Sequence, residues 1–334
     1  MRCHAGYAAL ARFATTVRFP QMDLDLMIEG QDGITWPQWT AIAAACERHG
    51  VGALFRSDHY LHFDERFPER GSLDALGTLA ALAGVTTTLR LGTLVSPATF
   101  RHPSELAKLA TTIDHVSAGR FELGLGAGWF EREHSAYGFE YYDLRTRVER
   151  LAEQLEIVHG NWGPGPFSFA GKHYQLVDLD AQPKPVQQPH PPLIMGGKAK
   201  PKVAALAARF ADEYNTAFAT PEEVAEIKRR IDAACERAGR QPMPISVMGG
   251  VIAGVDEADL RARTSRAAAF RGVDVEELLR EPSKGWIVGT VEQVAEQLRA
   301  VRDVGVDRMM CQTLPPADLE FVEILGSQLA PLVA

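Results

Sequence analysis

The chain has 334 residues, 46% of them hydrophobic and 23% charged, which is typical of a soluble globular protein. Its 35 basic and 43 acidic residues give a net charge of −8, and the basic residues form no long run, so binding to nucleic acid or to an anionic membrane surface is disfavoured. No apolar run approaches the roughly 18–20 residues of a membrane-spanning helix, so we expect no membrane segment.

The N-terminal residues and the cysteines indicate the cellular compartment of the protein. Residues 1–17 are basic and mildly apolar, but Arg12 interrupts the apolar run before the hydrophobic region of a signal peptide could form. No pair of cysteines has the spacing of a zinc site or a redox motif; the four are Cys3, Cys46, Cys235 and Cys311. We therefore predict an N-terminal tail over residues 1–17, buried thiols and a cytoplasmic protein.

From residue 18 onward, short apolar runs of strand length alternate with amphipathic stretches of helix length. The clearest unit lies between Leu89 and Trp129, where a strand over 89–95, a helix that opens at Pro103 and a strand over 121–126 follow one another. Two consecutive strands joined by a crossover helix must be parallel. Similar units predict eight strands, which begin near residues 20, 51, 89, 121, 192, 211, 245 and 306. Helices are expected at about 36–49, 74–84, 103–119, 143–159, 201–210, 221–238, 291–304 and 316–332.

Two stretches depart from this alternation. Residues 161–191 are rich in Pro and Gly and contain the pattern of a small hairpin, and residues 254–285 are charged and helical in character. We interpret both as insertions in a single domain that spans residues 18–334. Eight strand–helix units predict a closed parallel (β/α)8 barrel, the TIM barrel. A doubly wound open sheet is the alternative, but the first strand–helix turn lacks its usual GxGxxG pattern.

In such barrels the active site forms at the carboxyl ends of the strands, so the residues that follow each predicted strand are the candidate site residues. They are Ser57, Asp58 and His59 after the second strand; Ser96 and Thr99 after the third; Trp129, Glu131, Glu133, His134 and Tyr137 after the fourth; Gly196, Gly197 and Lys198 after the fifth; and Gln312 after the eighth. No metal site is predicted, because the first strand lacks the HxH pair that is common in hydrolytic barrels.

Each of these features also has a purely structural explanation. Asp58 and His59 could cap the next turn, and the glycines within 124–128 could form a tight turn without a ligand. The glycine pair before Lys198 suits a phosphate held by backbone N–H groups, but an ordinary loop explains it equally well. Asp58 and Glu133 could form the carboxylate pair of a glycosidase, which would leave the phosphate-like loop without a use.

With these residues considered together, the chain resembles the luciferase-like monooxygenase superfamily, and most closely its branch of oxidoreductases that use the deazaflavin coenzyme F420. The resemblance extends from about residue 18 to the C-terminus. The matching segments are LFRSDHY at 54–60, RLGTLVSPATFRHPSELAKLATTIDHVSAGRFELGLGAGWFEREHSAYGF at 90–139, PKPVQQPHPPLIMGG at 183–197, ADEYN at 211–215 and VGTVEQVAEQLRAVRDVGVDRMMCQ at 288–312.

The resemblance implies a barrel whose flavin or deazaflavin ring lies over the strand ends. It places Asp58 and His59 beside the ring or the substrate as catalytic residues, and Tyr60 and Trp129 at the substrate. A non-prolyl cis peptide at about Leu94–Val95 is expected to support the ring. The other residues implied in cofactor binding are Gly126, Ala127 and Gly128 near the ring or ribityl chain, His134 and Tyr137 near the cofactor tail, and Gly196 and Gly197 at the phosphate.

One departure concerns Trp129. Deazaflavin sugar-phosphate dehydrogenases of the superfamily carry an acidic Glu at this point, just after the glycines of the fourth strand. The tryptophan makes sugar or simple alcohol oxidation by that mechanism doubtful and favours a role in walling the substrate pocket.

Three functions follow from these observations. The first is an oxidoreductase that moves a hydride between F420 and a small organic substrate, with His59 as general acid or base. The second is an FMN-dependent monooxygenase that uses O2 and reduced flavin from a partner reductase, and the third is a non-catalytic flavin-binding barrel. The resemblance also implies a homodimer formed through helices and the third and fourth strand–helix units.

Overall fold

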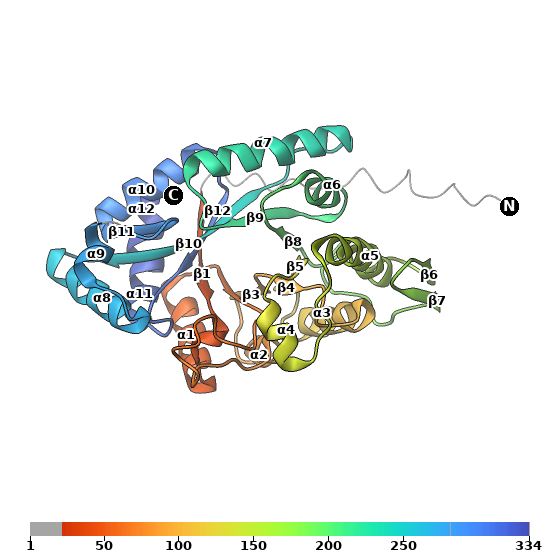
Figure 1. The fold of residues 1–334 in the computed structure, drawn as a ribbon, viewed down its shortest axis with the longest axis horizontal. Helices are drawn as coiled ribbons and strands as arrows, with labels where there is room; N and C mark the ends of the chain where they lie inside the picture. The colour runs from red at the N-terminus through yellow and green to blue at the C-terminus, as the bar shows by residue number, and fades with distance from the viewer. Residues whose placement is uncertain (1–21, 281, 334) are drawn as a thin grey trace.

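Eight parallel strands close into a barrel in the computed structural model, which describes residues 22–280 and 282–333 (Figure 1). Around the barrel the order is β10-β12-β1-β2-β3-β5-β8-β9, and β9 pairs back with β10, so the sheet has no free edge within this ring. The strands are β1 Asp23–Ile28, β2 Ala53–Arg56, β3 Arg90–Thr93, β5 Phe121–Gly126, β8 Leu193–Gly196, β9 Glu213–Ala217, β10 Ile245–Gly254 and β12 Arg308–Gln312. The predicted TIM barrel is confirmed. The predicted tail over residues 1–17 lies outside the described residues.

Helices surround this ring (Figure 1). They are α1 Trp36–His49, α2 Ala75–Ala83, α3 Pro103–Val116, α5 Leu144–Trp162, α6 Pro201–Phe210, α7 Pro221–Arg237 and α10 Val291–Asp303, followed by α11 Leu319–Glu323, a π-helical turn Ile324–Leu329 and α12 Ala330–Val333. None of the helices within the described ranges combines the length and apolar character that crossing a membrane requires.

Helix α7 shows how local sequence sets these bounds. Thr220 accepts a hydrogen bond from the backbone N–H of Glu223, whose carboxylate accepts one from the N–H of Thr220 in return, and Pro221 occupies the first helical position. Val224 and Ile231, seven positions apart, lie on one face of the helix and are buried in the core.

The first insertion contains the predicted hairpin, formed by β6 Phe167–Ala170 and β7 Gln175–Leu179. The second contains α8 Glu257–Arg271 and α9 Val275–Arg280. The sequence analysis missed the strand β11 Trp286–Thr290 that follows them. Strand β10 explains it, because the barrel uses only the first half of this long strand. Its second half, Gly250–Gly254, pairs with β11 instead.

Three smaller features also differ from prediction. A short helix that was not predicted, α4 Glu131–Tyr137, follows β5, and a two-residue strand, β4 Ser96–Pro97, pairs with the end of β5. Helix α3 ends at Val116 rather than at Gly119, because Ala118 and Gly119 both have left-handed φ angles of 53° and 85°.

Near the amino ends of the strands, Arg308 from β12 gathers three buried carboxylates. Its guanidinium nitrogens lie 3.1 Å from Asp25 of β1, 2.8 Å from Glu122 of β5 and 3.2 Å from Glu213 of β9. Burial raises the pKa of Asp25 to about 7 and also raises that of Glu213. Burial opposes ionisation of Glu122 too, but Arg308 and Arg90 lower its pKa to about 2. One cation therefore holds four strands together at this end.

At the opposite end, the glycines of β5 and β8 make room for Val95. The Leu94–Val95 peptide is cis, as the resemblance implied. A Cβ at Gly124 would lie 2.0 Å from the Thr93 carbonyl oxygen, and one at Gly126 would lie 2.7 Å from a Val95 methyl group. The GLGAG pattern thus reflects close packing between adjacent strands.

Replacing Arg308 by Met should destabilise the fold by about 3–5 kcal/mol near pH 7.5, because it leaves Asp25 and Glu213 buried without their cation and Glu122 with Arg90 alone. The loss should be smaller at pH 5.5, where Asp25 and Glu213 can bind protons, since their pKa values are already raised in the folded chain. Urea unfolding at the two pH values measures this. The exposed Arg237 of α7, replaced by Met, is the control and should change stability by no more than about 0.5 kcal/mol. A loss that grows toward low pH would contradict the assignment.

Replacing Gly124 by Ala should cost about 1–3 kcal/mol, because its Cβ cannot be placed without moving the backbone of Thr93. The matched control is Gly77→Ala in α2, where the nearest atom to the new Cβ is 3.4 Å away. That change should instead stabilise the protein by up to about 1 kcal/mol. Equal stability of the two variants in urea would show that the close approach at Gly124 is unimportant.

Candidate functional site

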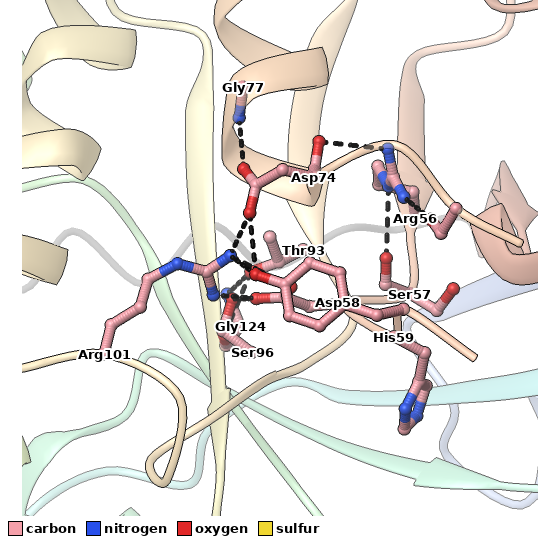
Figure 2. Close-up of polar contacts among 12 residues, drawn as sticks. Arg56, Ser57, Asp58, His59, Asp74, Gly77, Thr93, Ser96, Arg101 and Gly124 are labelled. Atoms are coloured by element: carbon pink, nitrogen blue, oxygen red, sulfur yellow. Dashed lines mark hydrogen bonds and ion pairs between the residues drawn. The ribbon is translucent and has the colours of Figure 1, made fainter. Parts of the chain in front are cut away.

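The loop that follows β2 carries the predicted catalytic pair at the carboxyl end of the barrel. Asp58 is buried, and its Oδ2 accepts hydrogen bonds from Ser96 Oγ at 2.6 Å and from Arg101 (Figure 2). Arg101 also donates to Asp74 at 2.6 Å, and the Tyr60 hydroxyl donates to Asp74 at 2.9 Å. Arg101 thus joins the loops after β2 and β3 to the start of α2.

His59 points away from this network (Figure 2). Its Nδ1 lies 2.9 Å from Oε2 of Glu133 in α4, and its side chain is 15% exposed. The edges of three aromatic rings surround the imidazole, with centroids 4.9 Å away for Phe63, 5.7 Å for Trp129 and 5.9 Å for Phe130. Burial alone would lower the pKa of His59, but the hydrogen bond and charge of Glu133 raise it above the ordinary value.

The residues predicted after β5 separate into two groups. His134 is buried, with Nδ1 2.7 Å from the Phe130 carbonyl oxygen and Nε2 2.7 Å from Thr99 Oγ1, so both nitrogens are already engaged. Trp129 and Tyr137 are exposed by 60% and 50%. Trp129 lies beside His59, whereas Tyr137 contacts the ring of Tyr60.

The predicted phosphate loop is also partly engaged. The N–H of Gly197 donates to the Asn215 carbonyl at 3.0 Å, and that of Ala199 donates to the Tyr214 hydroxyl at 2.8 Å. Lys198, between them, lines a cavity of about 320 Å³ together with Arg230 and Lys284. Gly196 lies beside Val95, Ala127 is half-buried, and Gly128 lies against Thr99.

Between these loops, the inside of the barrel presents an apolar floor. It is formed by buried side chains from several strands, namely Met27, Ala53, Phe55, Leu94, Ile194, Met248 and Met310, with the half-buried Val95 packed against them. Polar groups lie beside this floor, after the end of β1 and in the middle of β9. Glu29, directly after β1, accepts a hydrogen bond from Gln31 at 2.7 Å, and Asn215 of β9 donates to Ser246 at 2.9 Å. An apolar floor with a polar rim suits a planar, hydrogen-bonding ring such as a flavin.

Sequence analysis did not recognise two groups of this site and did not predict the partner of a third. Glu29 was missed because the register of the first strand was unclear, and Arg101 because it lies five residues beyond the strand-end Ser96. Glu133 was named as a candidate after the fourth predicted strand, but its contact with His59 was not predicted, because it depends on α4. Within the described part of the chain, no group of three or more His, Cys, Asp or Glu side chains is placed to hold a metal ion.

The loop over residues 60–71 also contacts the second insertion, through Arg70. The guanidinium of Arg70 lies between two aromatic rings, 3.9 Å from the centroid of Phe67 and 3.8 Å from that of Phe270 in α8. Arg70 also donates a hydrogen bond of 3.0 Å to the Phe270 carbonyl. The second insertion therefore contacts the loop that begins with His59 and Tyr60.

Two curated proteins show what the sequence is similar to. The chain is 30% identical over 293 residues to pyrimidine monooxygenase RutA of Stutzerimonas stutzeri (strain A1501), covering 78% of this chain and 79% of that protein. It is 28% identical over 284 residues to the FMNH2-dependent dimethylsulfone monooxygenase of Pseudomonas putida, covering 76% of each.

Solved structures agree on the fold. Monooxygenase RslO1 from Streptomyces bottropensis superposes with a TM-score of 0.78 at 20% identity, covering 94% of this chain and 100% of that one. An F420-dependent secondary alcohol dehydrogenase gives 0.76 at 18% identity, covering 94% and 99%. At such identities these similarities show the fold alone.

The prediction of F420 as cofactor, and of hydride transfer to or from it, is wrong. The similar curated proteins are monooxygenases, one of them named as FMNH2-dependent. The error has a structural cause, because the segments that suggested F420 largely form barrel strands and their helices. A monooxygenase and an F420-dependent enzyme share this fold, as the nearly equal TM-scores show.

The family model of luciferase-like monooxygenases matches residues 19–308, which include the first seven barrel strands along the chain, the first residue of β12 and the loops that carry His59 and Glu133. Together with the sequence similarity to RutA over more than three quarters of both chains, this match assigns the family. The chain belongs to the luciferase-like monooxygenases.

Proposed function

We propose that this protein is an FMN-dependent monooxygenase that oxygenates a small organic substrate with O2. The observation that carries the proposal is the similarity to an FMNH2-dependent monooxygenase over 76% of both chains. The apolar floor with its polar rim supports it, since it fits the ring of a flavin. Reduced FMN, when bound, supplies two electrons, so that one oxygen atom enters the substrate and the other leaves as water.

Residues at the carboxyl ends of the barrel strands would bind the flavin ring, its phosphate and the substrate. Leu94 and Val95 would carry the flavin ring, and the loop from Gly196 to Lys198 would face its phosphate. Lys198 is the better candidate for charge contact there, because the N–H of Gly197 is already engaged. Trp129, beside His59, would bound the substrate.

His59 is the group placed to hold or move a proton. It is mostly buried among aromatic rings, which exclude water from the imidazole, and its ion-pair partner is the carboxylate of Glu133. Asp58, predicted as catalytic, has Oδ2 occupied by Ser96 and Arg101, which supports a role in holding the loops. The partner reductase and the homodimer stay predictions.

The cofactor assignment is tested by anaerobic titration of the apoprotein. Binding of reduced FMN should change the absorbance and fluorescence of the sample, and this change should saturate as FMN is added. F420 should give no comparable response. Saturable binding of F420 with no response to FMN would overturn the proposal.

Oxygen transfer is tested with 18O2, a flavin reductase and a panel that begins with pyrimidines and dimethylsulfone. One 18O atom should appear in the product. Replacing His59 by Ala should retain flavin binding but lower turnover about 10²–10⁴-fold, because proton transfer is lost. The control is His115→Ala, an exposed residue near the end of α3, which should leave turnover unchanged. Full activity of the His59 variant would remove this residue from the mechanism.

A further inference from the structure

We propose that Glu133 is a positioning residue that fixes the tautomer of His59, with the proton on Nδ1 and Nε2 left free to react. The inference rests on the proposed function, in which His59 handles a proton. None of the sequence patterns or relatives described above assigns this role to Glu133.

The first step is the placement of the carboxylate. The Glu133 side chain is fully buried, and its Oε1 accepts hydrogen bonds from the backbone N–H groups of Tyr60 and of Leu61, the latter at 2.9 Å. A buried carboxylate is stable only when such donors satisfy it. These two N–H groups hold Glu133 in place independently of His59, so the carboxylate is already fixed where the imidazole meets it.

The second step is the direction of the hydrogen bond to His59. An ionised carboxylate can only accept, so Nδ1 of His59 must be the donor to Oε2 across the 2.9 Å that separate them. In the neutral ring Nε2 then lacks a proton and can accept one. The surrounding edges of Phe63, Trp129 and Phe130 hinder rotation of the ring away from this arrangement.

The third step is the balance of charge around the imidazole. The charged groups that act on His59 are Glu133 from α4, Glu29 from the end of β1 and Asp58 from its own loop, and all three favour the protonated ring. Asp58 is itself paired with Arg101. Glu133 is therefore the hydrogen-bonded partner that both orients the neutral imidazole and stabilises it once Nε2 has taken a proton.

Replacing Glu133 by Gln gives a direct test of the proposal. In Glu133→Gln the amide oxygen must face the N–H groups of Tyr60 and Leu61, because they require an acceptor. The amide NH2 then faces Nδ1 of His59 and donates to it. The variant keeps the shape of the side chain but reverses the tautomer, which places the proton on Nε2.

The experiment is imidazole 15N–1H correlation spectroscopy on the whole protein, with the His59 signals identified by their loss in His59→Ala. The unmodified protein should show Nδ1 protonated at high pH and Glu133→Gln should show Nε2 protonated. The titration midpoint of His59 should fall in the variant. Glu131→Gln, an exposed carboxylate in the first turn of the same helix, should change neither.

Turnover provides a second readout. Glu133→Gln should lower kcat on the order of 10²-fold while KM and the Kd for reduced FMN change by less than about threefold. A purely structural role would lower stability without reversing the tautomer. The proposal is overturned if the unmodified protein carries the proton on Nε2, or if Glu133→Gln retains the Nδ1–H tautomer. Because the tautomer is measured without flavin or substrate, these outcomes are separate from failure of the proposed monooxygenase activity.

Discussion

Closure of the sheet between β9 and β10 is the constraint on which the rest of the structure depends. A parallel strand must satisfy its backbone hydrogen bonds on both sides, and the ring does this for all eight strands without leaving an edge. Closure also brings the carboxyl ends of strands that are far apart in sequence to one rim. His59, Val95, Glu133 and Gly196 meet there although they span 137 positions of numbering, from 59 to 196. The site is thus a product of the barrel rather than of any one segment.

Buried charges serve different purposes at the two ends of the barrel. At the amino ends, Arg308 forms ion pairs with carboxylates from three other strands, and these pairs hold the strands together. At the carboxyl ends, Asp58 is neutralised by its ion pair with Arg101. Glu133 is instead paired with a histidine, which can change its protonation state. Of these two pairs, only the pair of Glu133 and His59 leaves a group, the imidazole, available for proton chemistry. The two adjacent residues Asp58 and His59 therefore have unlike roles, which their proximity in sequence conceals.

The features that sequence analysis predicted are those that depend on local interactions. The bounds of α7 follow from Thr220, Pro221 and Glu223, which contact one another within four residues. The missed elements depend on distant partners. Strand β11 forms because the second half of β10 has a free edge, and α4 is tied to the β2 loop by hydrogen bonds between Glu133 and Tyr60, 73 positions away. The cofactor was predicted wrongly because the segments that suggested it largely build a barrel that monooxygenases and F420-dependent enzymes share.

Strand β10 separates two parts of the protein that can change independently. Its first half belongs to the barrel and its second half to β11, so the segment from α8 to β11 is carried on a rigid extension outside the ring. This segment still reaches the mouth, since Phe270 of α8 holds Arg70 in the loop after His59. Insertions, deletions or exchanges between residues 257 and 285 can therefore change the contacts of the loop after His59 while the barrel strands keep their register. A change of sequence or length in this segment therefore needs no change in the barrel itself.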